Sequence, residues 1–225
     1  MKAFSTAFTR GLPHGILAAV HLPEHPDEIP TKVLHRLHAD ERSHAEGLTA
    51  RRRVEWIGGR LAAKTAASAL GVDLGALLSD EYGAPQAPNS LTISISHKDN
   101  LAIALVARRK HGLVGVDLEY FGRDRTHIAP KILTTREQAD VESLVEDRRW
   151  TAILLRFAIK EATYKALAPR LQRYIAFDEA EVSAIAEGEA KITLTLQEGL
   201  PPRKIEGRYD WLHEGLVASV RVHWD

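Results

Sequence analysis

The sequence predicts an α+β fold, because helical segments and runs of strands occupy separate stretches of the chain. Residues 31–70 have a helical pattern and are followed by strand-like segments. A second helical stretch, about 136–167, is also followed by strands. Each half therefore consists of helices followed by hairpin-like strands, and two similar halves with a boundary near 110–116 are expected. A chain of 225 residues allows one large domain or two of about half that length.

The N-terminal elements are predicted in chain order. Residues 14–20 (HGILAAV) form a short strand, and the Pro-rich stretch 21–30 is irregular. Residues 31–70 are helical, and Gly71 is expected to stop this helix. Its apolar face contains Trp56, Leu61, Ala63 and Leu70.

A hairpin is predicted next. Residues 79–90 (SDEYGAPQAPNS) are dense in turn formers. Residues 91–96 and 101–107 then alternate or run apolar on either side of a short polar turn, which is typical of a β-hairpin. A further strand is expected at about 113–120.

The C-terminal half begins with helices. Residues 134–138 (TTREQ) carry a capping signature for a helix near 136–146. A longer helix is expected from about 149 to 167, stopped by Pro169. Strands are expected at about 181–186, 190–197, 203–210 and 215–223.

The composition excludes several classes of protein. The 44% apolar and 27% charged residues rule out wholesale disorder. Thirty basic residues balance thirty acidic ones, so neither nucleic acid nor a membrane is expected as a partner. The absence of cysteine excludes disulfides, thiolate zinc sites and a cysteine nucleophile. No stretch approaches the ~20 apolar residues of a membrane helix, and the N-terminus does not resemble a signal peptide. We expect a soluble cytoplasmic protein, and no repeat is evident as sequence identity.

One strand carries two carboxylates. In GVDLE (115–119), Asp117 and Glu119 point to the same face, about 6.6 Å apart along the strand. Val116 and Leu118 point the other way, toward the core. Oxygen ligands of this kind suit Mg²⁺ or Mn²⁺. Taken alone, this short motif is better explained by a solvated strand face, which accommodates acids without a metal.

A helix in the same half carries lysines beside an acid. In FAIKEATYKAL (157–167), one face presents Phe157, Glu161 and Lys165 in succession, and Lys160 lies next to Glu161. Taken alone, this pattern is better explained by an i,i+4 surface ion pair. Together with the strand, it provides three carboxylates, those of Asp117, Glu119 and Glu161, with lysines nearby. That combination suits phosphoryl-group chemistry, in which a metal bridges phosphate oxygens and cations offset charge on the leaving group.

The two motifs together resemble the signature of 4′-phosphopantetheinyl transferases. That signature is GVDxE followed some forty residues later by [WF]xxKEAxxK, and this chain has GVDLE at 115–119 and FAIKEATYK at 157–165. The length is similar to that of the surfactin/enterobactin-type members. Phe157 stands where many members have Trp, which is a change in packing.

The resemblance extends to further segments and favours the siderophore-type branch. Residues 51–64 (RRRVEWIGGRLAAK) resemble that branch's arginine helix, and residues 81–85 (EYGAP) resemble a loop bordering the adenine. Residues 94–97 (SISH) resemble a strand whose end touches the nucleotide phosphate. Residues 172–182 (QRYIAFDEAEV) resemble the segment after the catalytic helix. Tyr82 and Ala84 replace residues that are often charged in relatives, so only backbone contacts are expected there.

The resemblance implies a fold and a reaction. Larger members have two similar halves related by a pseudo-twofold, with the active site at their interface. Here residues 1–112 would form the CoA-binding half and residues 113–225 the half with both signature motifs. The phosphopantetheine arm of coenzyme A would be transferred to a serine of an apo acyl or peptidyl carrier protein, releasing 3′,5′-ADP. This is a holo-[acyl-carrier-protein] synthase activity, used in siderophore, nonribosomal-peptide, polyketide or fatty-acid biosynthesis.

The resemblance also implies residue roles. Asp117, Glu119 and Glu161 would ligate Mg²⁺, with Mn²⁺ as an alternative. Glu161 would be the general base for the serine, directly or through a metal-bound water. Lys160 and Lys165 would bind the pyrophosphate and stabilise the departing 3′,5′-ADP. The catalytic residues are thus Asp117, Glu161 and Lys165. The remaining residues expected to bind CoA are Arg52, Arg53, Arg60, Tyr82, Gly83, Ala84, Pro85, Ser96 and His97.

Two other functions stay open on the sequence. One is a Mg²⁺-dependent phosphohydrolase using the same carboxylates and lysines, and the other is a non-catalytic CoA-binding module. The segment 121–134 and the start of the following helix are the candidate carrier-binding surface. A monomer is expected, because both halves of the site would lie in one chain.

Overall fold

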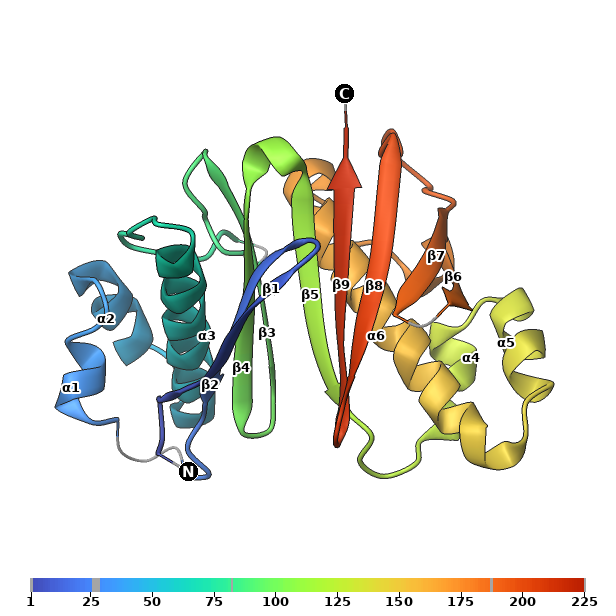
Figure 1. Ribbon diagram of the computed structural model, residues 1–225, viewed down its shortest axis with the longest axis horizontal. Coiled ribbons are helices and arrows are strands. Elements are labelled where there is room, and N and C mark those ends of the chain that lie inside the picture. The colour runs from blue at the N-terminus through green and yellow to red at the C-terminus, as the bar shows by residue number, and fades with distance from the viewer. Residues whose placement is uncertain (1, 26–28, 82, 187, 225) are drawn as a thin grey trace. The chain divides into compact units, whose positions relative to one another are not determined.

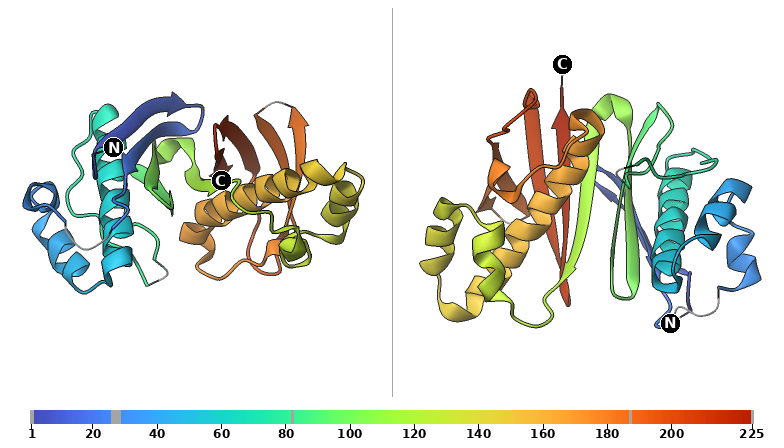
Figure 2. Two further views of the ribbon diagram at one scale, coloured as in Figure 1. Left: turned by 90° about the horizontal axis from the view of Figure 1, so that it is seen from below. Right: turned by 180° about the vertical axis from the view of Figure 1, so that it is seen from behind.

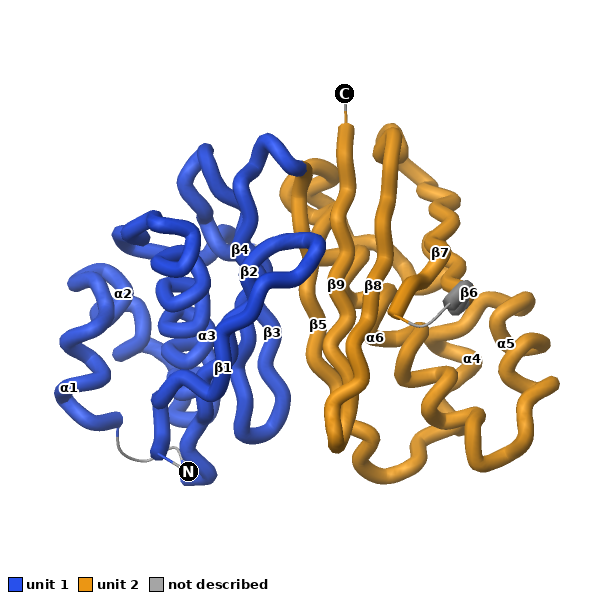
Figure 3. The backbone as a smooth tube through the Cα atoms, in the orientation of Figure 1, with its two compact units in different colours: residues 1–111 blue, residues 112–225 orange. Residues whose placement is uncertain are grey.

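The chain forms two compact units, residues 1–111 and 112–225 (Figure 3). A computed structural model describes residues 2–25, 29–81, 83–186 and 188–224. Each unit contains one antiparallel sheet with a long helix packed on it. The α+β class and the presence of two similar halves are therefore confirmed.

The first unit builds a four-stranded sheet in the order β1-β2-β4-β3 (Figure 1). Its longest helix, α3 (Ala50–Ala69), packs on the central strands β2 (Gly15–His21) and β4 (Leu101–Arg108). The other elements are β1 (Thr6–Leu12), α1 (Thr31–Leu34), α2 (Ala39–Glu46), β3 (Leu91–Lys98) and a 3₁₀ turn at Arg109–His111.

Two glycines let α3 lie close to this sheet. A Cβ at Gly58 would collide with the Leu22 side chain, and one at Gly59 would meet Ile95. The helix face that contains them is buried, including Ile57 and Leu61. Close packing of this kind excludes water from the apolar face and supplies most of a helix's stability.

The first unit differs from the sequence expectation in two places. Strand β1 was not predicted, and the single helical stretch at 31–70 is three helices. The reason for the breaks is local, because His38 caps α2 in a capping box with Glu41, and Thr49 has an extended conformation directly before α3. The expected stop at Gly71 is confirmed, since its φ of +70° suits a glycine directly after a helix. The hairpin of β3 and β4 is also confirmed.

The second unit builds a five-stranded sheet in the order β5-β9-β8-β7-β6. Its long helix α6 (Glu146–Leu171) lies on one face, against β5 (Leu113–Tyr120) and β9 (Gly215–His223) (Figure 2). The other elements are a 3₁₀ turn at Thr126–Ile128, α4 (Ala129–Ile132), α5 (Thr135–Glu142), a 3₁₀ turn at Phe177–Glu179, β6 (Ala180–Ala186), β7 (Glu189–Leu194) and β8 (Lys204–Leu212).

The predicted stop of the long helix at Pro169 is wrong. Helix α6 runs through Pro169 and ends at Leu171, where Gln172 takes a left-handed conformation. Proline removes one hydrogen bond from the last turn, and the helix continues for only two residues beyond it. Neither α6 nor any other helix in the described part of the chain is long and apolar enough to cross a membrane.

The segment after α6 is fixed by a buried carboxylate. Glu179 accepts two hydrogen bonds from the Arg173 guanidinium, at 2.9 and 2.6 Å, and one each from the backbone N–H groups of Ala176 and Gln197. The hydrogen bonds from Arg173 are the main cause that lowers the pKa of Glu179 to about 2. The carboxylate therefore joins three parts of the chain in its ionised form.

This lowered pKa predicts a pH-dependent loss of stability in the variant Glu179→Gln. A carboxyl whose pKa is lower in the folded than in the unfolded state, where it is about 4.3, stabilises the fold above that value. Glu179→Gln should therefore lower Tm at pH 7, and its deficit should shrink as the pH falls from about 5 to about 2. Thermal melts across this range test it, with Glu46→Gln as the control, because Glu46 is exposed in the first unit. A deficit independent of pH would contradict the ion-pair explanation.

Candidate active site

The strand with two carboxylates and the helix with lysines lie against each other in the second unit. A Cβ at Gly115 would collide with the backbone carbonyl of Ala162, so glycine is required for β5 and α6 to approach this closely. Gly115 precedes Asp117 on the strand, and Ala162 follows Glu161 on the helix. The contact therefore brings both motifs to one place.

The acids of the strand are buried. Asp117 is 4% exposed and Glu119 9% exposed, while Val116 and Leu118 are buried in the core. Buried carboxylates are rare unless they have partners. A solvated strand face, which the sequence alone favoured, does not describe these two residues.

Lys165 reaches from the helix to the strand. Its Nζ donates to Asp117 Oδ1 at 2.6 Å and to the backbone carbonyl of Val116 at 3.2 Å. The lysine side chain is 30% exposed and the aspartate side chain 6%. This ion pair joins α6 to β5, so Lys165 is not confined to a surface pair along its own helix.

Glu161 lies in the same electrostatic environment. Burial raises the pKa of Glu161, Lys165 lowers it, and the carboxylates of Asp117 and Glu119 raise it further. The structure thus brings Asp117, Glu119, Glu161 and Lys165 together. A carboxyl with a raised pKa beside other acids is a common feature of active sites, because proton transfer near neutral pH needs such a group.

The donor set fits a hard cation. Among the described residues, no group of three His, Cys, Asp or Glu side chains forms a ready metal cage. Mg²⁺ does not require one, since it usually keeps several waters and binds one or two carboxylates together with substrate phosphates. The neighbouring acids that raise the pKa of Glu161 are the charge that a cation would neutralise.

Lys160 is placed differently from the sequence expectation. Its side chain is fully buried, and Nζ donates to Glu137 Oε2 at 2.6 Å and to the carbonyls of Ile132 and Phe177, both at 2.8 Å. An ammonium has three protons, so these acceptors use all of them. The structure does not bring Lys160 to the acidic cluster, and the assignment of a phosphate to this lysine needs revision.

In the first unit, Arg52 and His97 form a second polar cluster. Arg52 NH1 donates to His97 Nε2 at 3.1 Å. Because arginine only donates, this nitrogen accepts, which requires the imidazole tautomer protonated at Nδ1. Glu55 lies beside both and also pairs with Arg51 Nε at 2.8 Å. The arginine side chain is 51% exposed, so its remaining donors are accessible to an anion.

The other two arginines assigned to phosphate face different partners. Arg53 Nε donates to the backbone carbonyl of Ala45. Arg60 is 4% exposed, donates to the Leu77 carbonyl and Ser79 Oγ, and stacks over the Trp56 ring at 4.0 Å. Burial lowers the pKa of Arg60 to about 10, which leaves it charged at neutral pH. Arg60 therefore holds Leu77 and Ser79, which lie just before residues 81–85, here called the glycine loop. We propose this structural role for Arg60 in place of a phosphate contact.

The glycine loop is a closed turn. Gly83 has a φ of +84°, which favours glycine, and Asp80 Oδ1 accepts from the Ala84 N–H at 2.9 Å. Ser79 and Pro85 form an isolated bridge across the loop. Tyr82 lies outside the described residues. Ser96 is buried on β3, next to His97.

Sequence reasoning missed several residues around these sites. Glu55 was overlooked, although it follows Arg51 by four residues and Arg52 by three. On a helix this spacing places the acid beside both arginines. Glu137 was noticed only as part of a capping signature. Its second role, as the partner of Lys160, depends on a contact 23 residues away along the chain.

A carboxylate cluster with a paired lysine suits an enzyme of phosphoryl-group chemistry. Two family models match the chain, the 4′-phosphopantetheinyl transferase superfamily over residues 113–219 and the 4′-phosphopantetheinyl transferase N-terminal domain over residues 40–107. The chain belongs to the 4′-phosphopantetheinyl transferase superfamily, as the two signature motifs predicted.

Named relatives agree with this membership. The chain is 31% identical to 4′-phosphopantetheinyl transferase Npt of Nocardia iowensis over 189 residues, covering 80% of this chain and 78% of the relative. It is 32% identical to PptT of Mycobacterium tuberculosis over 60% of this chain and 59% of that protein. It is 31% identical to enterobactin synthase component D of Salmonella typhi, over 60% and 56%. The siderophore-type branch is thereby supported.

Solved structures of holo-(acyl-carrier-protein) synthases are also similar. One from Bacillus anthracis, in complex with CoA (3′,5′-ADP), has a TM-score of 0.42 and 22% identity, covering 51% of this chain and 97% of that one. Another, from Thermotoga maritima, has a TM-score of 0.42 and 25% identity, covering 51% and 64%.

Proposed function

We propose that this chain transfers the 4′-phosphopantetheine arm of coenzyme A to a serine of an apo carrier protein, releasing 3′,5′-ADP. The observation that carries the proposal is the cluster of Asp117, Glu119, Glu161 and Lys165, built by the two motifs that define the family. Family membership indicates that coenzyme A is the donor and a carrier protein the acceptor. The cluster provides the carboxylates and the lysine that the reaction requires.

The reaction balances with groups present in the chain. The serine oxygen attacks the phosphorus attached to the pantetheine arm, and the bond from that phosphorus to the bridging oxygen breaks. Glu161 accepts the serine proton, which it later releases to solvent. The electron pair leaves with the bridging oxygen on 3′,5′-ADP, and the ammonium of Lys165 offsets that charge.

A magnesium ion would be held by one or two of the carboxylates of Asp117, Glu119 and Glu161, together with waters and oxygens of the substrate. When bound, it would neutralise charge on the pyrophosphate. The chain's own part is to keep these carboxylates in place. The Lys165 ammonium holds the Asp117 carboxylate through a hydrogen bond. The close contact at Gly115 fixes the distance between strand β5 and helix α6.

For the nucleotide, we assign phosphate contacts to Arg52 and His97. Arg52 is accessible, and arginine forms bidentate hydrogen bonds with phosphate. We propose that residues 1–112 bind CoA, with the backbone of Gly83, Ala84 and Pro85 and the Ser96–His97 strand end beside it. The pseudo-twofold relation between the halves and a site at their interface remain predictions of the family resemblance.

The carrier protein is proposed to dock on the segment that runs from the end of β5 into the first turn of α5. This segment carries the exposed basic residues Arg123, Arg125, Lys131 and Arg136. Carrier proteins are typically acidic around their serine, and complementary charge accelerates encounter. The carrier's pathway, the cytoplasmic location and the monomeric state stay predictions.

The proposal is tested by intact-protein mass spectrometry. Apo carrier proteins from fatty-acid, polyketide and peptide pathways are incubated with this protein, coenzyme A and Mg²⁺. We expect a mass gain of one phosphopantetheine on at least one carrier, equimolar 3′,5′-ADP, and loss of both when EDTA is added.

The other functions give different results. Hydrolysis of phosphate esters without a carrier, and no gain on any carrier, would indicate a phosphohydrolase. No turnover with coenzyme A still binding would indicate a non-catalytic module. Either result would overturn the proposed reaction.

A further inference from the structure

The helices of the two units are equivalent at a constant spacing of 96 residues. Helices α2 (Ala39–Glu46) and α5 (Thr135–Glu142) begin and end 96 residues apart, and so do the first residues of α3 and α6. Both short helices begin with a capping box, from His38 and from Thr134. The sequence repeat that was not evident beforehand follows this register without a gap. Between 37–70 and 133–166, eleven positions are identical: Leu37/Leu133, Glu41/Glu137, Glu46/Glu142, Leu48/Leu144, Arg52/Arg148, Arg53/Arg149, Ile57/Ile153, Arg60/Arg156, Ala62/Ala158, Lys64/Lys160 and Ala66/Ala162.

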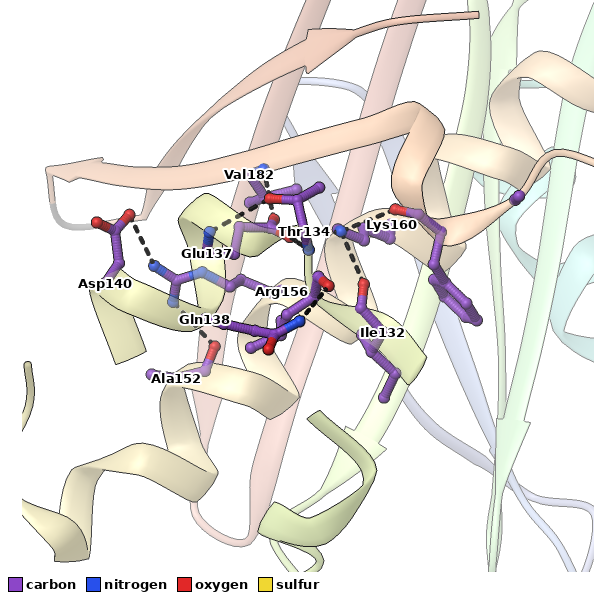
Figure 4. Close-up of polar contacts among 12 residues, drawn as sticks. Ile132, Thr134, Glu137, Gln138, Asp140, Ala152, Arg156, Lys160 and Val182 are labelled. Atoms are coloured by element: carbon purple, nitrogen blue, oxygen red, sulfur yellow. Dashed lines mark hydrogen bonds and ion pairs between the residues drawn. The ribbon is translucent and has the colours of Figure 1, made fainter. Parts of the chain in front are cut away.

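In the second unit, the repeated Lys–Glu pair is Lys160 with Glu137, and both side chains are buried (Figure 4). We call such a pair a clamp, because its hydrogen bonds hold several segments of the chain together. Glu137 accepts from Lys160 Nζ, from the Thr134 N–H at 2.7 Å and, through its other oxygen, from the Val182 N–H at 2.7 Å. Lys160 also holds the carbonyls of Ile132 and Phe177. The pair therefore ties α6 to the end of α4, the start of α5 and the start of β6.

The first unit contains the same clamp. Glu41 is fully buried, accepts hydrogen bonds from the His38 N–H at 2.7 Å and the Leu77 N–H at 3.0 Å, and forms an ion pair with Lys64 Nζ at 3.2 Å. Lys64 also donates to the carbonyls of Leu74 and Gly75. This pair ties α3 to the start of α2 and to the segment that leads into the glycine loop.

Comparing the two units separates structural from chemical roles. The positions equivalent to Glu161 and Lys165 are Thr65 and Ala69, so the first unit lacks the acid and the lysine of the acidic cluster. It nevertheless keeps the clamp lysine with three oxygen acceptors. The Lys64 side chain is 19% exposed, yet its ammonium is held by a glutamate and two backbone carbonyls as that of Lys160 is. This arrangement occurs in a half without the cluster, so it does not depend on the phosphate chemistry of the cluster.

We infer that Lys160 with Glu137, and Lys64 with Glu41, are paired positioning residues, each ordering the substrate-binding segment of its own unit. This inference rests on the proposed function for the identity of the substrates. In the second unit the clamp atoms neighbour the exposed basic residues Lys131 and Arg136, which directly precede Ile132 and Glu137. That clamp orders the carrier-binding segment. In the first unit, the clamp fixes Leu77, whose carbonyl is held by Arg60 ahead of the glycine loop. That clamp orders the CoA-binding segment.

The experiment compares matched variants of the two clamps, after thermal melts have shown each to be folded. Lys160→Met should raise the KM for the carrier about tenfold, while the KM for CoA and the Kd for 3′,5′-ADP stay within about twofold. Lys64→Met should do the reverse, raising the Kd for 3′,5′-ADP in calorimetry about fivefold with the carrier KM unchanged. A structural defect without positioning would not divide its effects between the two substrates.

Pairing is tested by Glu137→Gln, which removes the charge but keeps an oxygen that can accept the capping hydrogen bond. It should raise the KM for the carrier, as Lys160→Met does. The double variant should have a KM no higher than that of the more strongly affected single variant. Should Lys160→Met not fold, Glu137→Gln carries the kinetic test alone.

Two results would overturn the inference. If Lys160→Met weakens 3′,5′-ADP as much as Lys165→Met does, Lys160 is a phosphate ligand. If the two changes in the clamp are additive, the residues do not act as a pair. Failure of the proposed function is recognised separately, because the wild-type protein would then modify no carrier. In that case the coupling of Glu137 and Lys160 is still measured in the free energy of unfolding.

Discussion

Asp117→Asn is expected to lower the rate of phosphopantetheine transfer by at least about 10²-fold, because it removes a charge that pairs with Lys165 and that we propose as a ligand of the cation. The loss should be in kcat, with CoA still bound through the first unit. Asparagine keeps the shape of the side chain, and Lys165 is partly exposed, so the lysine left behind is still solvated. The fold should therefore survive.

The measurement is the initial rate of carrier modification at saturating Mg²⁺, together with a thermal melt. Asp147→Asn is the matched control, because Asp147 is exposed in the first turn of the same helix that carries Glu161. Its rate should equal that of the wild type. Wild-type turnover in Asp117→Asn would show that the cluster does not hold the metal.

Glu161→Gln is expected to lower kcat by about 10²–10⁴-fold and to leave the affinity for CoA unchanged, as for the loss of a general base. Burial is the main cause that raises the pKa of Glu161, with Lys165 opposing it and the two neighbouring carboxylates adding to it. A base must be deprotonated to act. Activity should therefore fall on the acid side as Glu161 takes up a proton, and this limb should vanish in the variant.

The same raised pKa has a consequence for stability. The folded state favours the protonated form of Glu161 more than the unfolded state does, so its charge destabilises the metal-free protein once the pH exceeds the unfolded value of about 4.3. Metal-free Glu161→Gln should melt at a higher temperature than the wild type at pH 8, and the difference should disappear below about pH 4.

Glu146→Gln is the control for both measurements, since Glu146 is exposed at the start of the same helix. An unchanged kcat in Glu161→Gln would exclude it as the base. A lower Tm at pH 8 would show that its charge stabilises the fold, contrary to the direction of its pKa.

Local features of the sequence predicted most of the elements. Segments that alternate or run apolar between turn formers predicted the strands from β3 to β9. The capping signature at 134–138 placed the start of α5, because that hydrogen bonding lies within one turn of helix. The strand β1 had no such signal, and Pro169 was over-weighted because a proline's effect depends on how much helix follows it.

The active site was predicted in part. Asp117, Glu119, Glu161 and Lys165 were identified from motif spacing, and the structure brings them together. Lys160, Arg53 and Arg60 were expected at phosphates. The three protons of Lys160 are used by Glu137 and two backbone carbonyls, whereas Arg53 and Arg60 each donate from Nε to a backbone carbonyl. Sequence spacing predicts which face of a helix a residue lies on. The direction in which a long cationic side chain extends depends on which acceptors the surrounding fold offers.

The sequence by itself determined the family, the element order and the four residues of the acidic cluster, because these follow from residue types at short spacing. The tertiary structure decided which lysine is available for chemistry and which is a clamp. It also revealed the 96-residue register between the two halves. The halves share only scattered residues, many of them buried, so the repeat is not evident from the sequence by itself. The eleven identities, which lie in two helices of each unit and in the residues that flank them, become visible once equivalent contacts, such as Lys64 with Glu41 and Lys160 with Glu137, align them. Contacts between residues far apart in sequence are made by packing, and packing is a property of the folded chain.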